Sequence, residues 1–390
     1  MSSNYSQRGV SAGKEDVHFA ISKLDQGLYP RAFCKISPDR VGGDEAYCNI
    51  MHADGSGTKS SLAYLYWRET GDLSVWEGII QDAVVMNLDD MLCAGATTGF
   101  LFSNTIGRNK FLISRDVLAT ILNGMEDFFA MLREHGIAIE STGGETADVG
   151  DVVRTMVVDA TAFCRMKRSQ VVTNEKIQAG DVILGLSSYG QATYESSYNS
   201  GIGSNGLTNA RHDMLSHEYA SRYPESYDVA SVPEHLVYAG PHKLTDIEPE
   251  TGQHIGKLLL SPTRTFLPLM HKVLGQHFED IHGLIHCTGG GQTKCLKFVE
   301  NLHIIKDNLL PTPPVFRLIQ EASKASWQEM YQVFNMGHRL EIYTNEETAK
   351  KITEMAANFN IDAQIIGRCE AAEQNQLTIE GEELVRYDQH

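Results

Sequence analysis

Strand-like and helix-like apolar patterns alternate along this chain, and that alternation limits its fold more than any other feature of the sequence. Across residues 74–96, apolar side chains recur at three- and four-residue steps, which predicts an amphipathic helix. The runs at 46–53 and 100–106 are typical of strands on either side of it. We therefore expect an α/β fold of the α+β type, with sheets and helices packed in layers.

The same patterns predict further elements in both halves of the chain. In the first half we expect a helix over 114–135 and strands over 136–141 and 155–164. In the second half we expect strands at 182–186, 282–288, 340–344 and 363–368, and helices from about 207 and over 322–333 and 347–359. Between them, 187–205 forms a loop that is unusually long for a compact domain.

The chain length favours two domains, because 390 residues exceed the usual size of one domain and are ample for two. The polar stretch 165–180 separates two strand-like runs and is the best linker candidate. We place the boundary at residue 167, so the predicted domains are 1–167 and 168–390.

Composition and charge exclude several classes of protein. An apolar fraction of 42% and a charged fraction of 21% are those of a packed globular protein, and no apolar run approaches the roughly 20 residues that cross a bilayer. The start of the chain lacks a basic segment followed by an apolar one, so we expect a cytoplasmic protein. Seven cysteines without a Cys-x-x-Cys pair indicate thiols. The net charge of −17 argues against nucleic acid as a partner.

The first motif with chemical potential is DGSGTK at 54–59, which follows a predicted strand. Gly55 and Gly57 allow backbone amides to approach an anion, and Thr58 adds a hydroxyl group. Lys59 supplies a mobile positive charge, and Asp54 can hold a metal ion. Phosphate binding is the natural use of such a turn, although a short Gly/Lys turn alone is more often only a turn.

The second motif is a group of acids on the predicted helix 74–96. Asp82 and Asp89 lie seven residues apart and share one face, and Asp90 lies about 100° further round. Carboxylates on an amphipathic helix usually form its solvated side. Here the flanking sequence is mostly apolar, so a bound cation that neutralises these acids is the competing interpretation.

Three glycine-rich segments complete the set of candidate sites. STGGETAD at 141–148 is expected to end a strand in a turn that carries Gly143, Gly144, Glu145 and Thr146, suited to a metal ion or a ribose. SGIGSNG at 200–206 and TGGGQT at 288–293 can form anion cradles at the start of a helix. Each of them alone could equally be an unoccupied turn.

Taken in order, nine blocks of this sequence resemble one family. They are YSQRGVSAGKE, DGSGTK, QDAVVMNLDDMLCAGA, GGETAD, AGDVILGLSS, SGIGSNGL, LLLSPTRTF, GLIHCTGGGQT and WQEMYQVFNMGHRLEI. This order is similar to that of the aminoimidazole ribonucleotide synthetase, or PurM-like, superfamily, and within it to the phosphoribosylformylglycinamidine cyclo-ligase branch. The resemblance extends from residue 5 to about residue 341.

The resemblance implies a homodimeric enzyme that uses ATP and Mg²⁺. Its amino-terminal domain would bind both and dimerise through its sheet, and its carboxy-terminal domain would add a second α/β layer. In the cyclo-ligase reaction, ATP activates the formyl oxygen of formylglycinamidine ribonucleotide as an iminophosphate. Ring closure then gives aminoimidazole ribonucleotide, a step of purine biosynthesis.

The resemblance also assigns roles to individual residues. Lys59, Asp54 and Asp90 would be catalytic, and a variant that lacks Lys59 would fold but lose turnover. Asp54, Asp90 and Glu145 would hold the metal ion. The residues expected around the cofactor are Asp54, Gly55, Gly57, Thr58, Lys59, Asp82, Asp89, Gly143, Gly144, Glu145 and Thr146. Those expected around the substrate's ribose phosphate are Ser204, Asn205, Gly289, Gly290 and Gly291.

Three departures from the family pattern leave the substrate open. The glycine-rich segment before DGSGTK is reduced to VGGDEAY at 41–47, and the loop from Tyr189 is about eleven residues longer than the pattern. Gly203 stands where the family has a histidine. His52 and His212 are candidates to replace that histidine, although each is more often an ordinary surface or packing residue.

Other members of the superfamily are alternatives to the cyclo-ligase. A thiamine-phosphate kinase fits the acidic motifs but not FNMG and TGGG. A selenophosphate synthetase would need a reactive cysteine in a glycine-rich context that Cys34 lacks, and a hydrogenase-maturation relative would end in cysteine. A non-catalytic member that kept the fold is the alternative of a different class.

Overall fold

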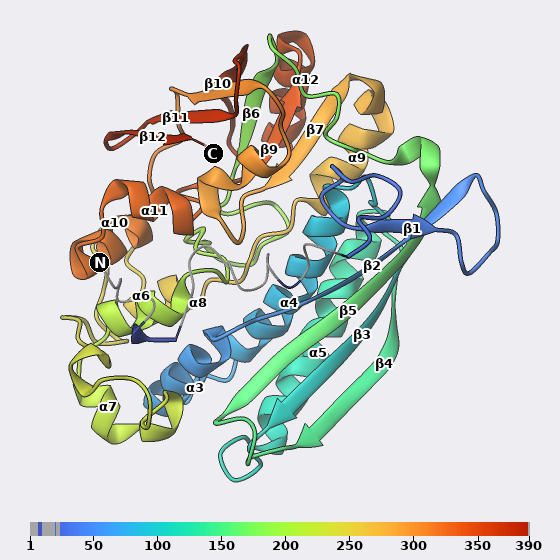
Figure 1. The fold of residues 1–390 in the computed structure, drawn as a ribbon. Coiled ribbons are helices and arrows are strands. Elements are labelled where there is room, and N and C mark those ends of the chain that lie inside the picture. Colours follow the sequence, from blue (N-terminus) through green and yellow to red (C-terminus); the bar gives the residue numbers. More distant parts are fainter. Residues whose placement is uncertain (1–6, 10–19, 21–23, 389–390) are drawn as a thin grey trace.

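The computed structural model describes residues 7–9, 20 and 24–388 of the chain. Apart from 7–9, the first block of the family resemblance, at 5–15, lies outside the described residues. Two separate sheets organise the rest of the chain (Figure 1). Among the described residues, no helix is both long enough and apolar enough to cross a membrane.

The first sheet has five strands in the order β1-β2-β5-β3-β4. Strands β3 and β4 run parallel, and the other neighbours are antiparallel. The helices α3, α4 and α5 belong to this half. The bounds are β1 Ile36–Pro38, β2 Tyr47–Gly55, α3 Lys59–Thr70, α4 Val75–Leu92, β3 Phe100–Arg108, α5 Arg115–Glu134, β4 Ile139–Asp148 and β5 Met156–Lys167. The last strand ends at Lys167, the residue at which the domain boundary is proposed.

The second sheet has seven strands in the order β12-β11-β8-β10-β6-β9-β7. Its strands are β6 Val182–Ser187, β7 Ile281–His286, β8 Leu302–Lys306, β9 His338–Thr344, β10 Ala363–Ala371, β11 Gln376–Glu380 and β12 Leu384–Asp388. Its helices are α6 Leu207–Met214, α7 Glu218–Arg222, α8 Ile255–Leu260, α9 Leu267–His277, α10 Pro314–Ser323, α11 Trp327–Val333 and α12 Glu346–Ala357. Short 3-10 turns lie at Arg168–Gln170, Pro224–Ser226, Glu234–Leu236, Phe278–Asp280 and Gly291–Lys297. The mixed α/β class expected from the sequence is confirmed.

Helix α4 lies between the two halves of the molecule (Figure 1). It packs on β2 and β5 of the first sheet and on α8 and α9 of the second half. Nearly all of its residues are buried, including Asp82, Asp89 and Asp90. The interpretation of these acids as a solvated face is therefore wrong, because the second half of the chain covers that face of the helix.

Two element boundaries differ from the expectation for identifiable reasons. The expected turn at 143–146 lies inside β4, because residues 144–148 pair with β3, and only Gly143, with a φ of 93°, departs from the extended conformation at a shift in the pairing register. Most of the expected helix 322–333 is α11, which begins at Trp327. The preceding helix α10 ends at Ser323, next to Lys324 with a φ of 58°, and Ser326 caps the start of α11 by accepting a hydrogen bond from the Glu329 amide. The helices α3, α7, α8 and α9 and most of α10 were not expected.

The two glycines of β4, Gly143 and Gly144, differ in the space around them, and this difference can be tested by substitution. A Cβ atom on Gly144 would lie 1.7 Å from the Asn104 Oδ1 atom, whereas one on Gly143 would meet nothing within 4 Å. Gly144→Ala should therefore lower the free energy of unfolding by about 3 kcal/mol through overpacking. Gly143→Ala should cost only about 1 kcal/mol, for a non-glycine residue at its φ of 93°. Urea denaturation of both variants measures the difference, and equal losses would contradict it.

Candidate active site

The turn DGSGTK joins the end of β2 to the start of α3, so its amides lie at a helix N-terminus. Asp54 is exposed, and its Oδ1 atom accepts a hydrogen bond from the Gly55 amide at 2.7 Å. The Thr58 hydroxyl lies 2.8 Å from the hydroxyl of Thr208 in α6. The turns at 54–59 and 200–206 therefore meet, each at the start of a helix.

Lys59 is fully buried, contrary to the expectation of a mobile charge. Its ammonium group donates to Asp82 Oδ1 at 3.0 Å, to the Gly203 carbonyl at 3.1 Å and to the Ser261 carbonyl at 2.6 Å. An ammonium group has three protons, and these three acceptors use them all. Lys59 thus fixes the SGIGSNG turn to α4, and direct contact with a phosphate would require it to break these bonds.

Asp82 and Asp89 bind the second half of the chain rather than a solvent-accessible site. Asp82 Oδ1 accepts from the amide and the hydroxyl of Thr263, at 2.8 and 2.6 Å. Asp89 accepts from the Thr265 hydroxyl at 2.6 Å and from the Phe266 amide at 3.0 Å. Both carboxylates are fully buried. Burial raises the pKa of Asp89, and the charge of Arg339 and the hydrogen bonds from Thr265 and Phe266 oppose that shift.

Asp90 lies between two imidazole rings that come from different halves of the chain. Its Oδ1 atom is 2.6 Å from His286 Nδ1, and its Oδ2 atom is 3.4 Å from His52 Nε2. Burial alone would raise the pKa of Asp90, but the hydrogen bonds from His286 and His52, together with the charge of His52, hold it well below the usual range. Asp90 is therefore an anion with both oxygens engaged.

The neighbours of His286 determine its protonation. Arg339 Nε lies 3.1 Å from His286 Nε2, and an arginine can only donate. Nε2 is consequently the acceptor, and the single ring proton is on Nδ1, where it points to Asp90. His286 is a neutral imidazole that orients the carboxylate.

The neighbours of His52 determine its protonation differently. The Asn87 amide group donates to the carbonyls of Ala83 at 2.9 Å and Asp54 at 3.1 Å, which leaves its Oδ1 atom as the acceptor 3.1 Å from His52 Nδ1. The other ring nitrogen faces Asp90, so both nitrogens face acceptors and His52 is an imidazolium. Burial opposes this state, but Asp90, Asn87 and the charge of Asp54 raise the pKa of His52.

The structure does not bring Glu145 to Asp54 and Asp90 within one chain. Across the sheet, Glu145 lies opposite Thr105, Thr105 lies opposite Asp159, and Asp159 lies opposite Gly55. In this row Glu145, Thr105 and Asp159 are exposed. The adjacent row, which contains Asp54, has buried members and faces the helices, so the two acids belong to rows that face opposite sides of the sheet. Three strand spacings, about 14 Å, also separate β2 from β4. Gly143, Gly144 and Thr146 lie on the same edge strand as Glu145.

The loops predicted to meet the substrate do come together. Gly203, Ser204, Asn205, Thr288 and Arg339 all line one narrow cavity. The glycines that follow Thr288, Gly289, Gly290 and Gly291, all have positive φ and lead into a 3-10 turn. Gly291 has no room for a side chain, since a Cβ atom there would lie 2.5 Å from the Tyr331 carbonyl.

Two residues of this site are not predicted from the sequence, and a third is predicted only as one of two alternatives. Arg339 and His286 were not singled out, although both lie inside blocks of the family resemblance. Arg339 is fully buried, and its Nη1 atom has no hydrogen-bond partner among the described residues. His52 belongs to the site, whereas His212 is a packing residue. Its ring lies 4.6 Å from that of Tyr238, and burial lowers its pKa to about 2.

A second cluster could geometrically hold a metal ion but is already neutralised. Ligand atoms of Cys287, His338 and Glu341 lie within 4.8 Å of one another, and all three residues are buried. Glu341 also pairs with Lys306, whose ammonium donates to the Gln292 carbonyl at 2.8 Å. Lys306 thus connects this cluster to Gln292 of the TGGGQT turn, and its positive charge disfavours a bound cation there.

Comparison with known proteins identifies the family. The family described as AIR synthase related protein matches residues 40–166 with its N-terminal domain and 178–380 with its C-terminal domain. This chain belongs to the AIR synthase related family.

Individual relatives are distant but similar over most of their length. The chain is 28% identical to a phosphoribosylformylglycinamidine cyclo-ligase of Methanocaldococcus jannaschii, covering 88% of this chain and 85% of that protein. It is 27% identical to that of Alkaliphilus metalliredigens, covering 93% and 91%. Among solved structures, the HypE-HypF complex matches with a TM-score of 0.55 at 14% identity over 97% of this chain and 99% of that chain. PurLQS from Thermotoga maritima matches with 0.51 at 12% identity over 88% and 44%. These structures show the fold.

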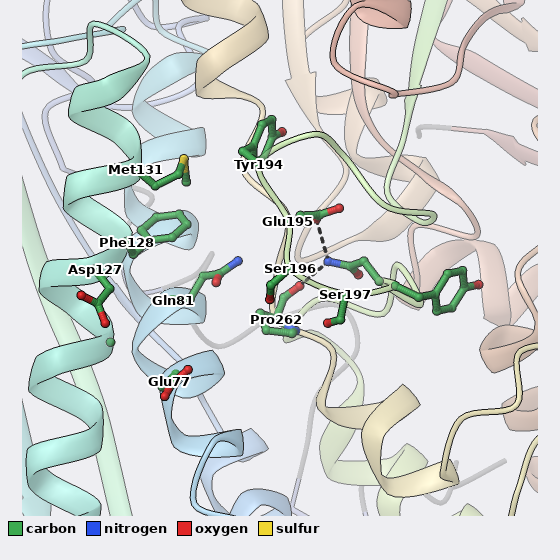
Figure 2. Close-up of a pocket in the computed structure, with 13 residues that line it drawn as sticks. Glu77, Gln81, Asp127, Phe128, Met131, Tyr194, Glu195, Ser196, Ser197 and Pro262 are labelled. Carbon is green, nitrogen blue, oxygen red and sulfur yellow. Dashed lines mark hydrogen bonds between the residues drawn. The ribbon is translucent and has the colours of Figure 1, made fainter.

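The long loop that distinguishes this family member from the expected pattern is rigidly attached. Glu195 forms an ion pair with Arg264 at 2.5 Å, and the Tyr194 hydroxyl donates to the Thr265 carbonyl at 2.5 Å. The loop faces α4 and α5 across a cavity of about 310 Å³ (Figure 2). None of the residues expected at the active site lines this cavity. The loop therefore supports the Thr263–Thr265 segment from outside the active site.

The buried position of Lys59 changes the expected effect of its removal. Lys59→Met leaves Asp82 as an unpaired buried charge and should lower the free energy of unfolding by about 3–5 kcal/mol. Lys257→Met is the matched control. It breaks a 2.6 Å pair with Asp72 whose side chains are each about one third exposed, which should cost below about 1 kcal/mol. Urea denaturation measures both. A stable Lys59→Met protein without turnover would instead restore the role of a mobile phosphate ligand.

Proposed function

We propose that this chain is an ATP-dependent ring-closing ligase that converts formylglycinamidine ribonucleotide to aminoimidazole ribonucleotide in purine biosynthesis. The names of the curated relatives support the ring closure. The observation that carries the proposal is the contact of α4 with the strand that leads into the DGSGTK turn, since Asn87 donates to the Asp54 carbonyl and His52 contacts Asp90. This arrangement places carboxylates beside backbone amides that can accept phosphate groups.

The donors at this corner fit Mg²⁺. The ion prefers oxygen ligands and is commonly held by one or two carboxylates together with substrate phosphates and water. Asp54 and Asp90 would supply the two carboxylates, because His52, two residues before Asp54 on β2, contacts Asp90. When bound, the ion would neutralise charge on the transferring phosphate. The amides of 55–58 would orient the phosphates at the start of α3.

The proposed reaction needs positioning more than covalent chemistry from the protein. The formyl oxygen of the substrate takes the terminal phosphoryl group of ATP, and ADP leaves. The amidine nitrogen then attacks the activated carbon, and the oxygen departs with its phosphoryl group as inorganic phosphate. Ser204, Asn205 and Thr288 line one cavity of about 10 Å³ beside the DGSGTK turn and would hold the ribose phosphate end once this cavity widens.

A homodimer is the proposed assembly, formed through the outer face of the first sheet. Met51, Phe163 and Leu101 form one row across three strands on that face. Met51 is 72% exposed and Leu101 is 42% exposed, so an apolar row that a second copy could cover faces outward. Glu145 lies on the same face and would then be at the interface.

One assay separates the alternatives. Purified protein is mixed with ATP, Mg²⁺ and formylglycinamidine ribonucleotide, and both ADP and aminoimidazole ribonucleotide are measured. Formation of both supports the proposal. ADP without the imidazole would indicate another kinase or synthetase of the superfamily, to be tested next with thiamine phosphate. A folded protein with no turnover would indicate a non-catalytic member.

Substitution of Asp90 tests the proposed catalytic role of a carboxylate most directly. Asp90→Asn keeps the shape of the side chain but removes its charge, so turnover should fall by about 100-fold or more. The matched control is Asp181→Asn, because Asp181 also pairs with a histidine, His282, at 2.8 Å but outside the site. Its turnover should equal that of the wild type. Full activity in Asp90→Asn would remove this carboxylate from the mechanism.

The proposed dimer can be tested on the apolar row. The double variant Met51→Lys and Leu101→Lys should elute as a monomer of 43.2 kDa in light-scattering chromatography, whereas the wild type should show twice that mass. Phe111→Lys is the control, because Phe111 is 99% exposed and outside the sheet. A double variant that stays dimeric would place the interface elsewhere.

A further inference from the structure

We propose that the cavity between the long loop and the helices α4 and α5 binds a small organic cation, a primary ammonium group on an aromatic body. The cavity lies outside the proposed active site, and its ligand has no part in the proposed ring closure. Three features of the cavity point to this ligand class: its volume, its division into an acidic and an apolar end, and its preformed walls.

The volume and the walls of the cavity are those of a small-molecule site. About 310 Å³ lies at the lower end of the range for ligand pockets. One face of α5 forms one wall, because the residues that reach the cavity follow one another at steps of three and four: Gly124, Asp127, Phe128 and Met131. The loop residues 194–199 form the opposite wall (Figure 2).

One end of the cavity is acidic. Glu77 of α4 and Asp127 of α5 lie at this end (Figure 2), and within the described part of the chain neither of them forms an ion pair. Burial raises the pKa of Glu77, and the charges of Asp127 and Asp72 raise it further. Glu195, by contrast, is already paired with Arg264. Two carboxylates that repel each other favour a cation between them, so this end of the cavity selects a positively charged ligand.

The other end of the cavity is apolar. Phe128 and Met131 of α5 are partly buried there, and Tyr194 lies across from them on the loop (Figure 2). The Tyr194 hydroxyl already donates to the Thr265 carbonyl, so the polar atom of this side chain needs no partner from a ligand. An aromatic body can pack against these side chains, while its ammonium group reaches the acidic end.

Contacts within the protein hold the walls of the cavity in place. The Asn199 side chain donates to the Pro262 carbonyl at 2.7 Å, and the Gln81 side chain donates to the Thr263 carbonyl at 2.9 Å. These bonds attach the loop and α4 to the same short segment of the second half. Binding would therefore order few further groups, which favours affinity for a small ligand.

Titration with 2-phenylethylamine, in the absence of nucleotide, tests the proposal. In protein labelled with ¹³C-methyl methionine, the Met131 signal should shift in a saturable way. That signal is assigned by its loss in Met131→Leu. The signal of Met51, on the outer face of the first sheet, should stay in place. The alcohol 2-phenylethanol has the same body without the charge, and it should bind about tenfold more weakly because it forms neither ion pair.

Variants of the two acids test the acidic end. Glu77→Gln and Asp127→Asn should each weaken amine binding about threefold, and the double variant about tenfold. Both residues are exposed, and their substitution relieves repulsion, so the variants should fold. Glu126→Gln is the matched control, because Glu126 lies next to Asp127 on α5 but does not line the cavity. Its affinity should equal that of the wild type.

Three results would overturn the proposal: a Met131 signal that does not shift, equal affinity for the amine and the alcohol, or an unchanged affinity in the double variant. None of these measurements depends on ring closure, so the proposed reaction and the cation site stand or fall separately.

Discussion

Buried carboxylates on α4 hold the two halves of the molecule together, and the rest of the site depends on them. Asp82 accepts hydrogen bonds from Thr263, Asp89 from Thr265 and Phe266, and Asp90 faces His286. All these partners come from the second half of the chain. Removing a carboxylate from water is costly unless its hydrogen bonds are replaced, so α4 can be buried only when the second half is in place. The carboxylates thereby fix the relative position of the two sheets.

This attachment explains how turns far apart in the sequence come to lie side by side. Lys59 is the last residue of the DGSGTK turn. Its ammonium group joins that turn to Asp82, to the Gly203 carbonyl and to the Ser261 carbonyl. The TGGGQT turn is supported separately, by Lys306 and Glu341 beneath Gln292. Two buried ion pairs therefore position the three glycine-rich turns.

The sequence predicts the fold class and most strands, because apolar periodicity records which faces are buried. It also identifies the turns that meet, through the order of the nine blocks. It could not show that Asp82, Asp89 and Lys59 are internal anchors, because the same carboxylates and lysine would serve equally well on a solvated surface. Glu145 was misplaced for a related reason. Its neighbouring glycines suggest a turn, but pairing with β3 over Asn104 and Thr105 keeps the segment extended and directs Glu145 to the outer face. Arg339 and His286 carry no local signal, since their roles arise only where β7 and β9 lie next to α4.

The balance of charge at the junction between the halves explains why His52 differs from the other cations there. The three buried acids of α4, Asp82, Asp89 and Asp90, lie among three cations, Lys59, Arg339 and His52. Lys59 neutralises Asp82, Arg339 acts on Asp89, and His52 contacts Asp90. Lys59 and Arg339 are held by buried carbonyls. His52 lies at the exposed end of this chain of contacts, with 21% of its side chain exposed, so solvent reaches it and does not reach the other two.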